Sequence, residues 1–144
     1  MRELSTSIEI DASPERVWAI LVDFGAYGEW NPFIKSIEGT PAVGERLRVE
    51  IAPPEGRAMT FKPAVKAAEP NRELRWLGRL IAPGLFDGEH RLQLEPLADG
   101  RTRFVQSERF TGMLVPVAGK GLANTERGFE EMNEALKRRA ETPA

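Results

Sequence analysis

Residues 117–140 read VAGKGLANTERGFEEMNEALKRRA, and this stretch decides the fold. Its apolar positions recur at spacings of three, four and four, which is the periodicity of one face of an α-helix. These positions are Phe129, Met132, Leu136 and Ala140. Glutamates crowd the first half of the stretch and basic residues close it, an order that suits the helix dipole. We therefore predict a long C-terminal helix with a buried apolar face.

The N-terminal half of the same helix face is lined by small residues. Gly121, Thr125 and Gly128 fall on almost the same side as Met132. Glycine costs about 1 kcal/mol relative to alanine inside a helix, so it usually has a reason there. One interpretation is that Gly121 and Gly128 open space for a ligand beneath the helix. The other is that the early glycines only mark an irregular helix start after Pro116.

The chain before this helix reads mainly as strands. Residues 4–10 alternate apolar and polar side chains, and Ser13-Pro14 is typical of a helix start. A second short helical segment is expected at 26–30. Further alternation predicts strands at about 33–39, 47–51, 59–65, 74–80, 90–95 and 104–110. Pro63 favours an edge position or a bulge in its strand. Short turns such as Asp99-Gly100 favour antiparallel pairing, so the expected class is α+β.

Composition excludes several classes of function. The 144 residues are 41% hydrophobic and 29% charged, with a net charge of −2, which fits one globular domain spanning 1–144 and gives no basic footprint for nucleic acid. One His and no Cys leave no recognisable zinc site, and no phosphate-binding or dinucleotide motif occurs. We expect no metal, no cofactor, no stable membrane insertion and a cytoplasmic location. The sequence does not indicate an oligomeric state.

Three polar residues share the inward, apolar phase of the last two strands: His90, Gln106 and Glu108. Pairing around the Asp99-Gly100 turn brings His90 opposite or diagonal to Glu108. Buried polar groups need partners or water. These residues therefore either line a ligand pocket, with His90 as polar anchor or proton shuttle, or form a hydrogen-bonded pair that fixes the hairpin. His90 and Glu108 are also the candidate catalytic residues.

Aromatic residues supply the expected cavity walls. Phe61, Trp76 and Phe104 lie mid-strand on the inward phase, and we predict that they contact ligand. Core packing is the expectation for most other aromatic residues. The loop from Ile81 to Asp87 carries Leu85 and Phe86 beside Pro83 and Gly84, so it is either an ordinary packed loop, a gate to the cavity or a segment that touches a membrane surface.

With this order of elements, the chain resembles the START-like, or helix-grip (SRPBCC), superfamily, and within it the bacterial polyketide cyclase/dehydrase-like subgroup. Three segments carry the resemblance: IDASPERVWAILVDFGAYGEWNP at 10–32, GEHRLQLEPLADGRTRFVQSERFTG at 88–112, and RGFEEMNEALKRRAE at 127–141. It implies a curved seven-stranded antiparallel sheet around the C-terminal helix, two short helices between the first two strands, and a cavity in between. Relatives of this kind bind or transform apolar and aromatic small molecules.

Three hypotheses for function follow. The first is binding, transport or sequestration of an apolar, aromatic or lipid-like small molecule in that cavity. The second is a polyketide cyclase or dehydratase that uses His90 and Glu108 as acid and base. The third is a regulatory protein that docks a partner through the Leu85-Phe86 loop. A sealed and fully packed interior would favour the third.

Overall fold

A computed structural model describes residues 1–79 and 84–143. The strands are β1 (Arg2–Ile10), β2 (Ile34–Glu38), β3 (Arg48–Ile51), β4 (Met59–Phe61), β5 (Ala64–Glu69), β6 (Glu73–Arg79), β7 (Asp87–Pro96) and β8 (Thr102–Thr111). The α-helices are α1 (Pro14–Val22), α2 (Tyr27–Trp30) and α3 (Gly119–Glu141). Short 3-10 turns occupy Phe24–Ala26, Ala98–Gly100 and Val115–Val117. The class is α+β, as the sequence predicts.

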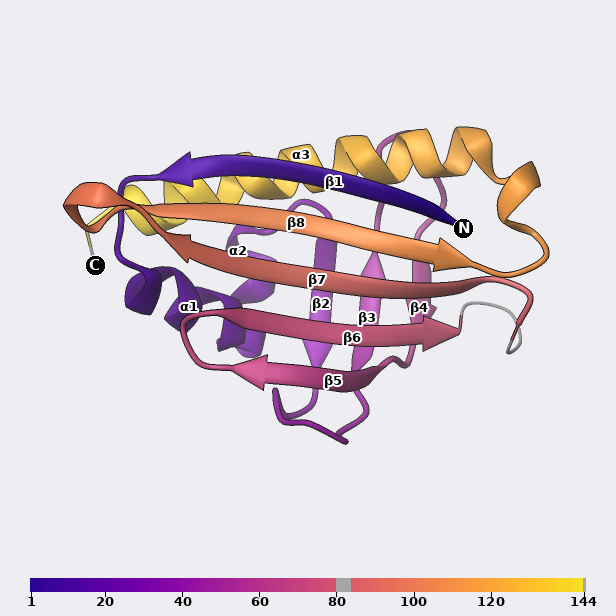
Figure 1. The fold of residues 1–144 in the computed structure, drawn as a ribbon, viewed down its shortest axis with the longest axis horizontal. Helices are drawn as coiled ribbons and strands as arrows, with labels where there is room; N and C mark the ends of the chain where they lie inside the picture. Colours follow the sequence, from indigo (N-terminus) through magenta and orange to yellow (C-terminus); the bar gives the residue numbers. More distant parts are fainter. Residues whose placement is uncertain (80–83, 144) are drawn as a thin grey trace.

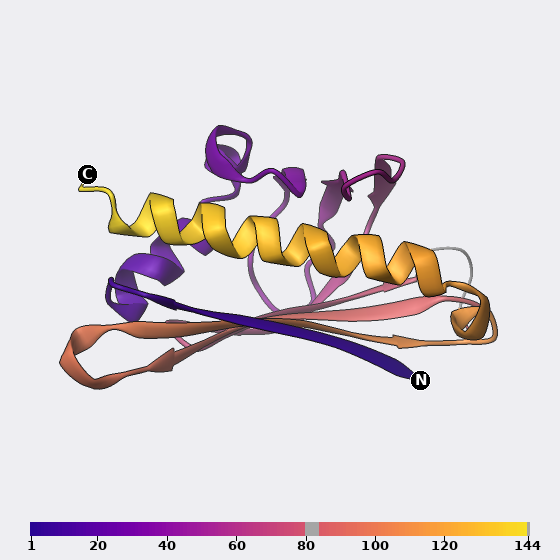
Figure 2. The same ribbon diagram turned by 90° about the horizontal axis from the view of Figure 1, so that it is seen from above.

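The long helix α3 lies along one face of the larger sheet (Figures 1 and 2). Phe129, Met132 and Leu136 are fully buried on its inner side, which confirms the predicted apolar face. Burying each such side chain stabilises the fold by about 1.5–3 kcal/mol. Helices α1 and α2 follow β1, as expected, and pack beside the C-terminal half of α3 (Figure 2). No helix among the described residues has the length and apolar character needed to span a membrane.

The larger sheet has the strand order β1-β8-β7-β6-β5, and every neighbouring pair is antiparallel. The β7–β8 hairpin is its longest pairing. Asp99 and Gly100 both have positive φ, 65° and 75°, which the predicted turn between these strands requires. The resulting register sets His90 directly opposite Glu108.

The expected single seven-stranded sheet is wrong: the described residues form eight strands in two sheets. β2, β3 and β4 make a separate sheet of order β2-β3-β4 that runs across the direction of the first (Figure 1). The predicted strand 59–65 breaks at Pro63, which has no N–H to donate to a ladder. β4 before it pairs with β3, and β5 after it pairs with β6.

The two sheets are joined where Pro63 turns the chain. The Pro63 carbonyl accepts a hydrogen bond of 2.8 Å from Leu47 N, and the Glu45 carbonyl accepts one of 2.8 Å from Val65 N. A bridge between Arg46 and Ala64 lies in the same place. Together the sheets therefore curve around α3, with the smaller sheet beyond the helix in Figure 2.

The layer of short helices is fixed by side-chain hydrogen bonds. Ser13 caps α1 by accepting from Arg16 N at 3.2 Å, as its place before Pro14 predicts. The Tyr27 hydroxyl is buried and donates to the Leu21 carbonyl at 2.6 Å. Asn31 Oδ1 accepts from the main-chain N–H groups of Phe33 and Ile34, which turns the chain into β2. This turn delivers Phe33 to the underside of α3.

Candidate functional site

A cavity of about 320 Å³ lies between the N-terminal half of α3 and the two sheets, and we call it the α3 cavity. Its apolar lining residues are Phe33, Ile34, Val49, Ile51, Pro53, Met59, Phe61, Trp76, Phe86, Phe110, Ala118 and Leu122. Its other lining residues are Gly56, Arg57, His90, Glu108, Gly121, Asn124 and Thr125. The smaller sheet supplies one wall, and β6, β7 and β8 supply the other.

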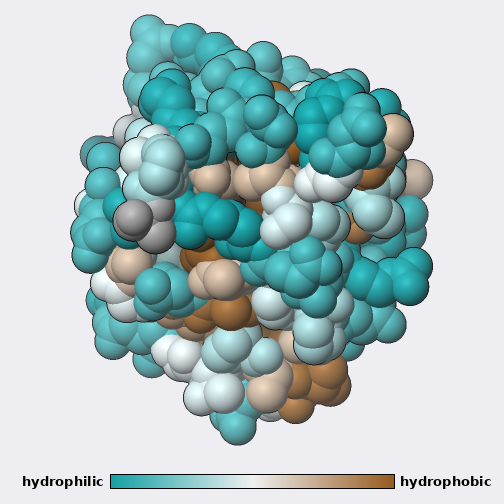
Figure 3. All heavy atoms as spheres, turned by 90° about the vertical axis from the view of Figure 1, so that its left-hand side faces the viewer, coloured by the Kyte–Doolittle hydropathy of each residue, from teal (hydrophilic) through white to brown (hydrophobic). Residues whose placement is uncertain are grey.

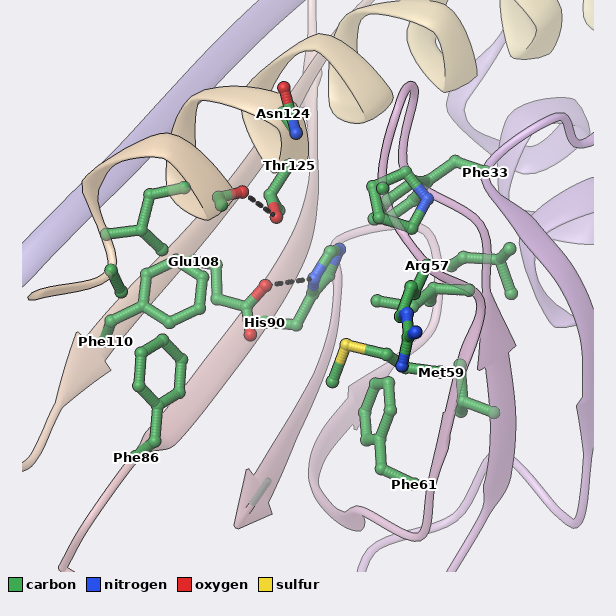
Figure 4. Close-up of a pocket in the computed structure, with 18 of the residues that line it drawn as sticks. Phe33, Arg57, Met59, Phe61, Phe86, His90, Glu108, Phe110, Asn124 and Thr125 are labelled. Carbon is green, nitrogen blue, oxygen red and sulfur yellow. Dashed lines mark hydrogen bonds and ion pairs between the residues drawn. The ribbon is translucent and has the colours of Figure 1, made fainter. Parts of the chain in front are cut away.

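The lining of the cavity is mainly apolar and includes several aromatic side chains (Figure 4). Phe86 and Phe110 stand on one side, with ring centroids 5.5 Å apart, and Met59 and Phe61 stand on the other. Such a lining favours an apolar or aromatic ligand, because few of its atoms compete for hydrogen bonds.

The only histidine of the chain meets a glutamate in this cavity. His90 Nδ1 lies 3.1 Å from Glu108 Oε1, and the two side chains point toward each other from β7 and β8 (Figure 4). The His90 side chain is 5% exposed and that of Glu108 is 12% exposed. Gly88 lies beside this carboxylate, and a side chain at that position would collide with Glu108 Oε2. The absence of a side chain at Gly88 therefore leaves room for the Glu108 carboxylate at the cavity wall.

Aromatic rings hold the His90 imidazole in one orientation. The ring stacks on Trp76 with centroids 5.1 Å apart and an interplanar angle of 14°. Phe129 of α3 approaches it edge to face, with centroids 5.0 Å apart. With two aromatic rings packed against it and both nitrogens engaged, His90 has little freedom to turn toward a ligand.

Behind His90, a chain of buried polar groups reaches α3. His90 Nε2 lies 2.9 Å from Gln106 Oε1, and Gln106 Nε2 donates to Asn133 Oδ1 at 2.8 Å. Asn133 Nδ2 donates in turn to Thr6 Oγ1 at 2.9 Å. Gln106 and Asn133 are at most 3% exposed. This network joins β1, β7, β8 and α3 and satisfies polar groups that would otherwise be costly to bury.

Six of the nine predicted ligand contacts line the α3 cavity: Phe61, Trp76, His90, Glu108, Gly121 and Thr125. The structure brings these together from two sheets and a helix. Phe104 and Gln106 are fully buried behind the wall and do not line it. Gln106 touches the site only through His90.

Gly128 also lies outside the lining, for a steric reason. The Phe33 ring packs against it, and a Cβ at this position would lie 2.6 Å from Phe33 Cε1. The small residue therefore makes room for a neighbouring side chain and opens no space for ligand. Apart from its chain neighbours and the nearby helix backbone, nothing lies within 4 Å of where a Cβ on Gly121 would be, so the open part of the cavity-lining helix face is at Gly121.

Sequence reasoning missed Arg57 and Asn133. Arg57 lies in the turn between β3 and β4, where no alternation marks which side chains face inward. Asn133 falls within the apolar stripe of α3, four residues after Phe129, and a polar residue at such a position was a signal for a buried hydrogen bond.

The β3–β4 turn that carries Arg57 is tied to α3 across the cavity mouth. Glu55 Oε2 pairs with Arg127 Nη2 at 2.6 Å. Both side chains are exposed, so the pair is worth at most about 1 kcal/mol. The pair nonetheless connects the β3–β4 turn of the smaller sheet to α3.

The opposite end of the molecule carries a different hollow, of about 380 Å³, between α1 and the C-terminal end of α3. Among the residues lining it are Arg16, Ile20, Asp23, Trp30 and Arg139. Hydrophilic residues cover most of this end, and hydrophobic ones appear only in patches between them (Figure 3). Because charged groups surround it, this hollow suits an apolar ligand less well than the α3 cavity.

The sequence model of one family, described as polyketide cyclase / dehydrase and lipid transport, matches residues 1–141. The chain belongs to this family. The expected place in the START-like (SRPBCC) superfamily, in its polyketide cyclase/dehydrase-like subgroup, is thereby confirmed. No curated protein sequence matches the chain.

Solved structures of other proteins share the fold of this chain. The Zhui aromatase/cyclase from Streptomyces sp. R1128 aligns with a TM-score of 0.78 at 18% identity, covering 97% of this chain and 93% of that one. A START superfamily protein from Mycobacterium smegmatis aligns with a TM-score of 0.74 at 25% identity, covering 96% and 97%. The match thus extends over nearly the whole of each chain.

Proposed function

We propose that this protein binds an apolar small molecule, aromatic or lipid-like, in the α3 cavity. The observation that carries the proposal is the cavity itself, about 320 Å³ of space walled mostly by aromatic and aliphatic side chains. At the packing density of organic crystals, roughly 20 Å³ per non-hydrogen atom, this space holds about 16 such atoms. A compound of two or three fused rings, or a chain of similar size, fits that estimate.

Membership of the family supports the same proposal. The family description joins polyketide cyclase / dehydrase with lipid transport. Members of one fold family differ in chemistry, so the lining residues carry more weight than the family name. The proposal therefore rests first on the apolar cavity walls.

An environment-sensitive naphthalene sulfonate dye tests the proposal. Trp76 lines the cavity, whereas Trp18 and Trp30 do not. We expect the dye to bind the native protein and to quench or shift tryptophan emission. In Trp76→Phe the dye should still bind, but the tryptophan response should be clearly smaller than in the native protein. A response as large as that of the native protein would put the dye nearer Trp18 or Trp30, and would contradict the proposal.

Catalysis is the second candidate, and the His90–Glu108 contact of 3.1 Å favours it. In this alternative the pair acts as acid and base on a polyketide-like substrate held by the aromatic walls. Incubation with a linear poly-β-ketone thioester tests it. Conversion that falls by about 10²–10⁴-fold in both His90→Ala and Glu108→Gln, with affinity kept, would establish the enzyme and overturn simple binding.

Partner docking through the Leu85-Phe86 loop has less support. The side chain of Phe86 contributes to the cavity wall and packs against Phe110, so it is not presented outward. Ile81, Ala82 and Pro83 of the same loop lie outside the described residues. An open, apolar cavity also differs from the packed interior that this hypothesis expects.

A further inference from the structure

We infer that the ligand of the α3 cavity is an apolar molecule with a neutral hydroxyl group, a phenol or an alcohol, that donates a hydrogen bond to Glu108 Oε2. The inference rests on the proposed function and names the chemical class that the site selects. It follows from the hydrogen-bond directions in the buried network behind His90.

Two main-chain carbonyl groups fix those directions, because a carbonyl oxygen can only accept. The Gln106 carbonyl accepts from the Thr6 hydroxyl at 3.1 Å, so Thr6 Oγ1 must accept from Asn133. Asn133 therefore presents Nδ2 to Thr6 and Oδ1 to Gln106. The Phe129 carbonyl, 3.4 Å from Gln106 Nε2, requires the same orientation of the Gln106 amide.

The oriented Gln106 amide determines the protonation of His90. Gln106 Oε1 accepts, so His90 Nε2 carries a hydrogen and donates it across 2.9 Å. On the other side of the ring, Nδ1 and Glu108 Oε1 approach to 3.1 Å, and two bare acceptors would repel each other there. One proton therefore lies between them. It belongs either to an imidazolium facing a carboxylate or to a carboxylic acid facing a neutral imidazole.

Both arrangements give Glu108, which lines the cavity, the same role toward a ligand. The pair as a whole is neutral and its one proton lies between Nδ1 and Oε1, so Glu108 Oε2 can only accept. No hydrogen bond to Oε2 comes from any described residue. Thr125 does not supply one, since its hydroxyl donates to the Gly121 carbonyl at 2.9 Å (Figure 4). A bound molecule that excludes water must therefore provide the donor, or leave the oxygen unsatisfied.

The charge of the inner wall selects among donors. A carboxylate on the ligand would face acceptor oxygens. An ammonium group could donate, but the neutral pair would not balance its charge in an apolar cavity. A neutral hydroxyl meets both requirements. Arg57 also lines the cavity, but it is exposed and belongs to the β3–β4 turn. It is the one arginine or lysine among the described lining residues, and it lies on the opposite wall from Glu108.

Displacement of a bound naphthalene sulfonate dye by matched naphthalenes tests the inference. The probes are 2-naphthol, 2-methoxynaphthalene, 2-naphthoate and 2-naphthylmethylamine. We expect 2-naphthol to bind about 10-fold or more tightly than 2-methoxynaphthalene, which has the same rings and oxygen but no donor. The acid and the amine should also bind more weakly than 2-naphthol.

Variants assign the preference to one oxygen. In Glu108→Gln the amide N–H can donate to His90 Nδ1 while the amide oxygen replaces Oε2, so the preference for 2-naphthol should persist. In Glu108→Met the acceptor is gone, and the preference should fall to about 3-fold or less. Glu95→Met is the matched control: it removes an exposed glutamate from β7 outside the cavity lining, and it should keep the wild-type preference.

The possible failures are distinct. If the dye and all four naphthalenes fail to bind, the proposed function and this inference both fail. If 2-methoxynaphthalene or the amine binds as tightly as 2-naphthol, the binding function stands and the hydroxyl inference is wrong. A preference that persists in Glu108→Met, or that is lost equally in Glu95→Met, would also overturn it, because the selecting group would then not be Glu108 Oε2.

Discussion

Filling the α3 cavity from the helix above should remove ligand binding without harming the fold. Gly121 lines the cavity, and no side chain or other segment beyond its chain neighbours lies within 4 Å of the point where its Cβ would stand. Gly121→Leu adds roughly 100 Å³ of side chain, about a third of the 320 Å³ available. Helix propensity changes in favour of the variant by about 0.8 kcal/mol. The melting temperature should therefore stay the same or rise.

The expected loss of affinity follows from area. If leucine displaces about 60 Å² of apolar dye surface, the loss at about 25 cal/mol per Å² is about 1.5 kcal/mol. That corresponds to a rise of roughly 10-fold in the Kd of a naphthalene sulfonate dye, measured by fluorescence titration.

A second glycine on the same helix provides the control. Gly119 also has open space around it, but it does not line the cavity, so Gly119→Leu should bind the dye like wild type. Wild-type affinity in Gly121→Leu would refute the reasoning. So would an equal loss in Gly119→Leu, because the effect would then not depend on the cavity.

Three further predictions concern the fold. Met132→Asp puts a charge into the core and should lower the free energy of unfolding by about 3 kcal/mol or more; a wild-type denaturation midpoint would contradict the burial of this helix face. Gly128→Ala should also be destabilising, because overpacking against Phe33 costs about 1–3 kcal/mol and exceeds the roughly 1 kcal/mol gained in helix propensity; a higher melting temperature would be the opposite result. Burial, with a smaller contribution from the charge of Asp23, raises the pKa of Tyr27, the only tyrosine. The neutral phenol therefore contributes fully to the free energy of unfolding at pH values below about 10, the ordinary pKa of tyrosine, and this contribution is lost as the pH rises above that value. Tyrosinate absorbance should therefore appear only together with unfolding, and ionisation in the folded state would contradict the burial.

The parts of the fold that depend on local pattern were predictable. The spacing of Phe129, Met132 and Leu136 identifies the inner face of α3, because helical periodicity links residues only a few positions apart. The contact between His90 and Glu108 was predictable for a similar reason. An antiparallel hairpin conserves the phase of its two strands, so the turn at Asp99-Gly100 determines which side chains share a face.

Features that depend on packing between distant segments were not predictable. Gly128 looked like open space, yet Phe33, far away in the chain, fills it. Pro63 signalled an irregularity, but only the different partners of β4 and β5 divide the sheet there. Arg57 belongs to a turn without alternation, so no local rule assigns it to the cavity. The cytoplasmic location remains a prediction.

The most direct test of the central claim is a methyl NMR titration of the protein with naphthalene. Met59, Leu122 and Ile51 line the α3 cavity, whereas Leu21 and Ile10 are buried outside it and serve as internal controls. The account predicts saturable chemical-shift changes for the methyl groups of the three lining residues, with the methyl groups of the two control residues unchanged. No shifts at the solubility limit of naphthalene, or shifts confined to Leu21 and Ile10, would contradict it.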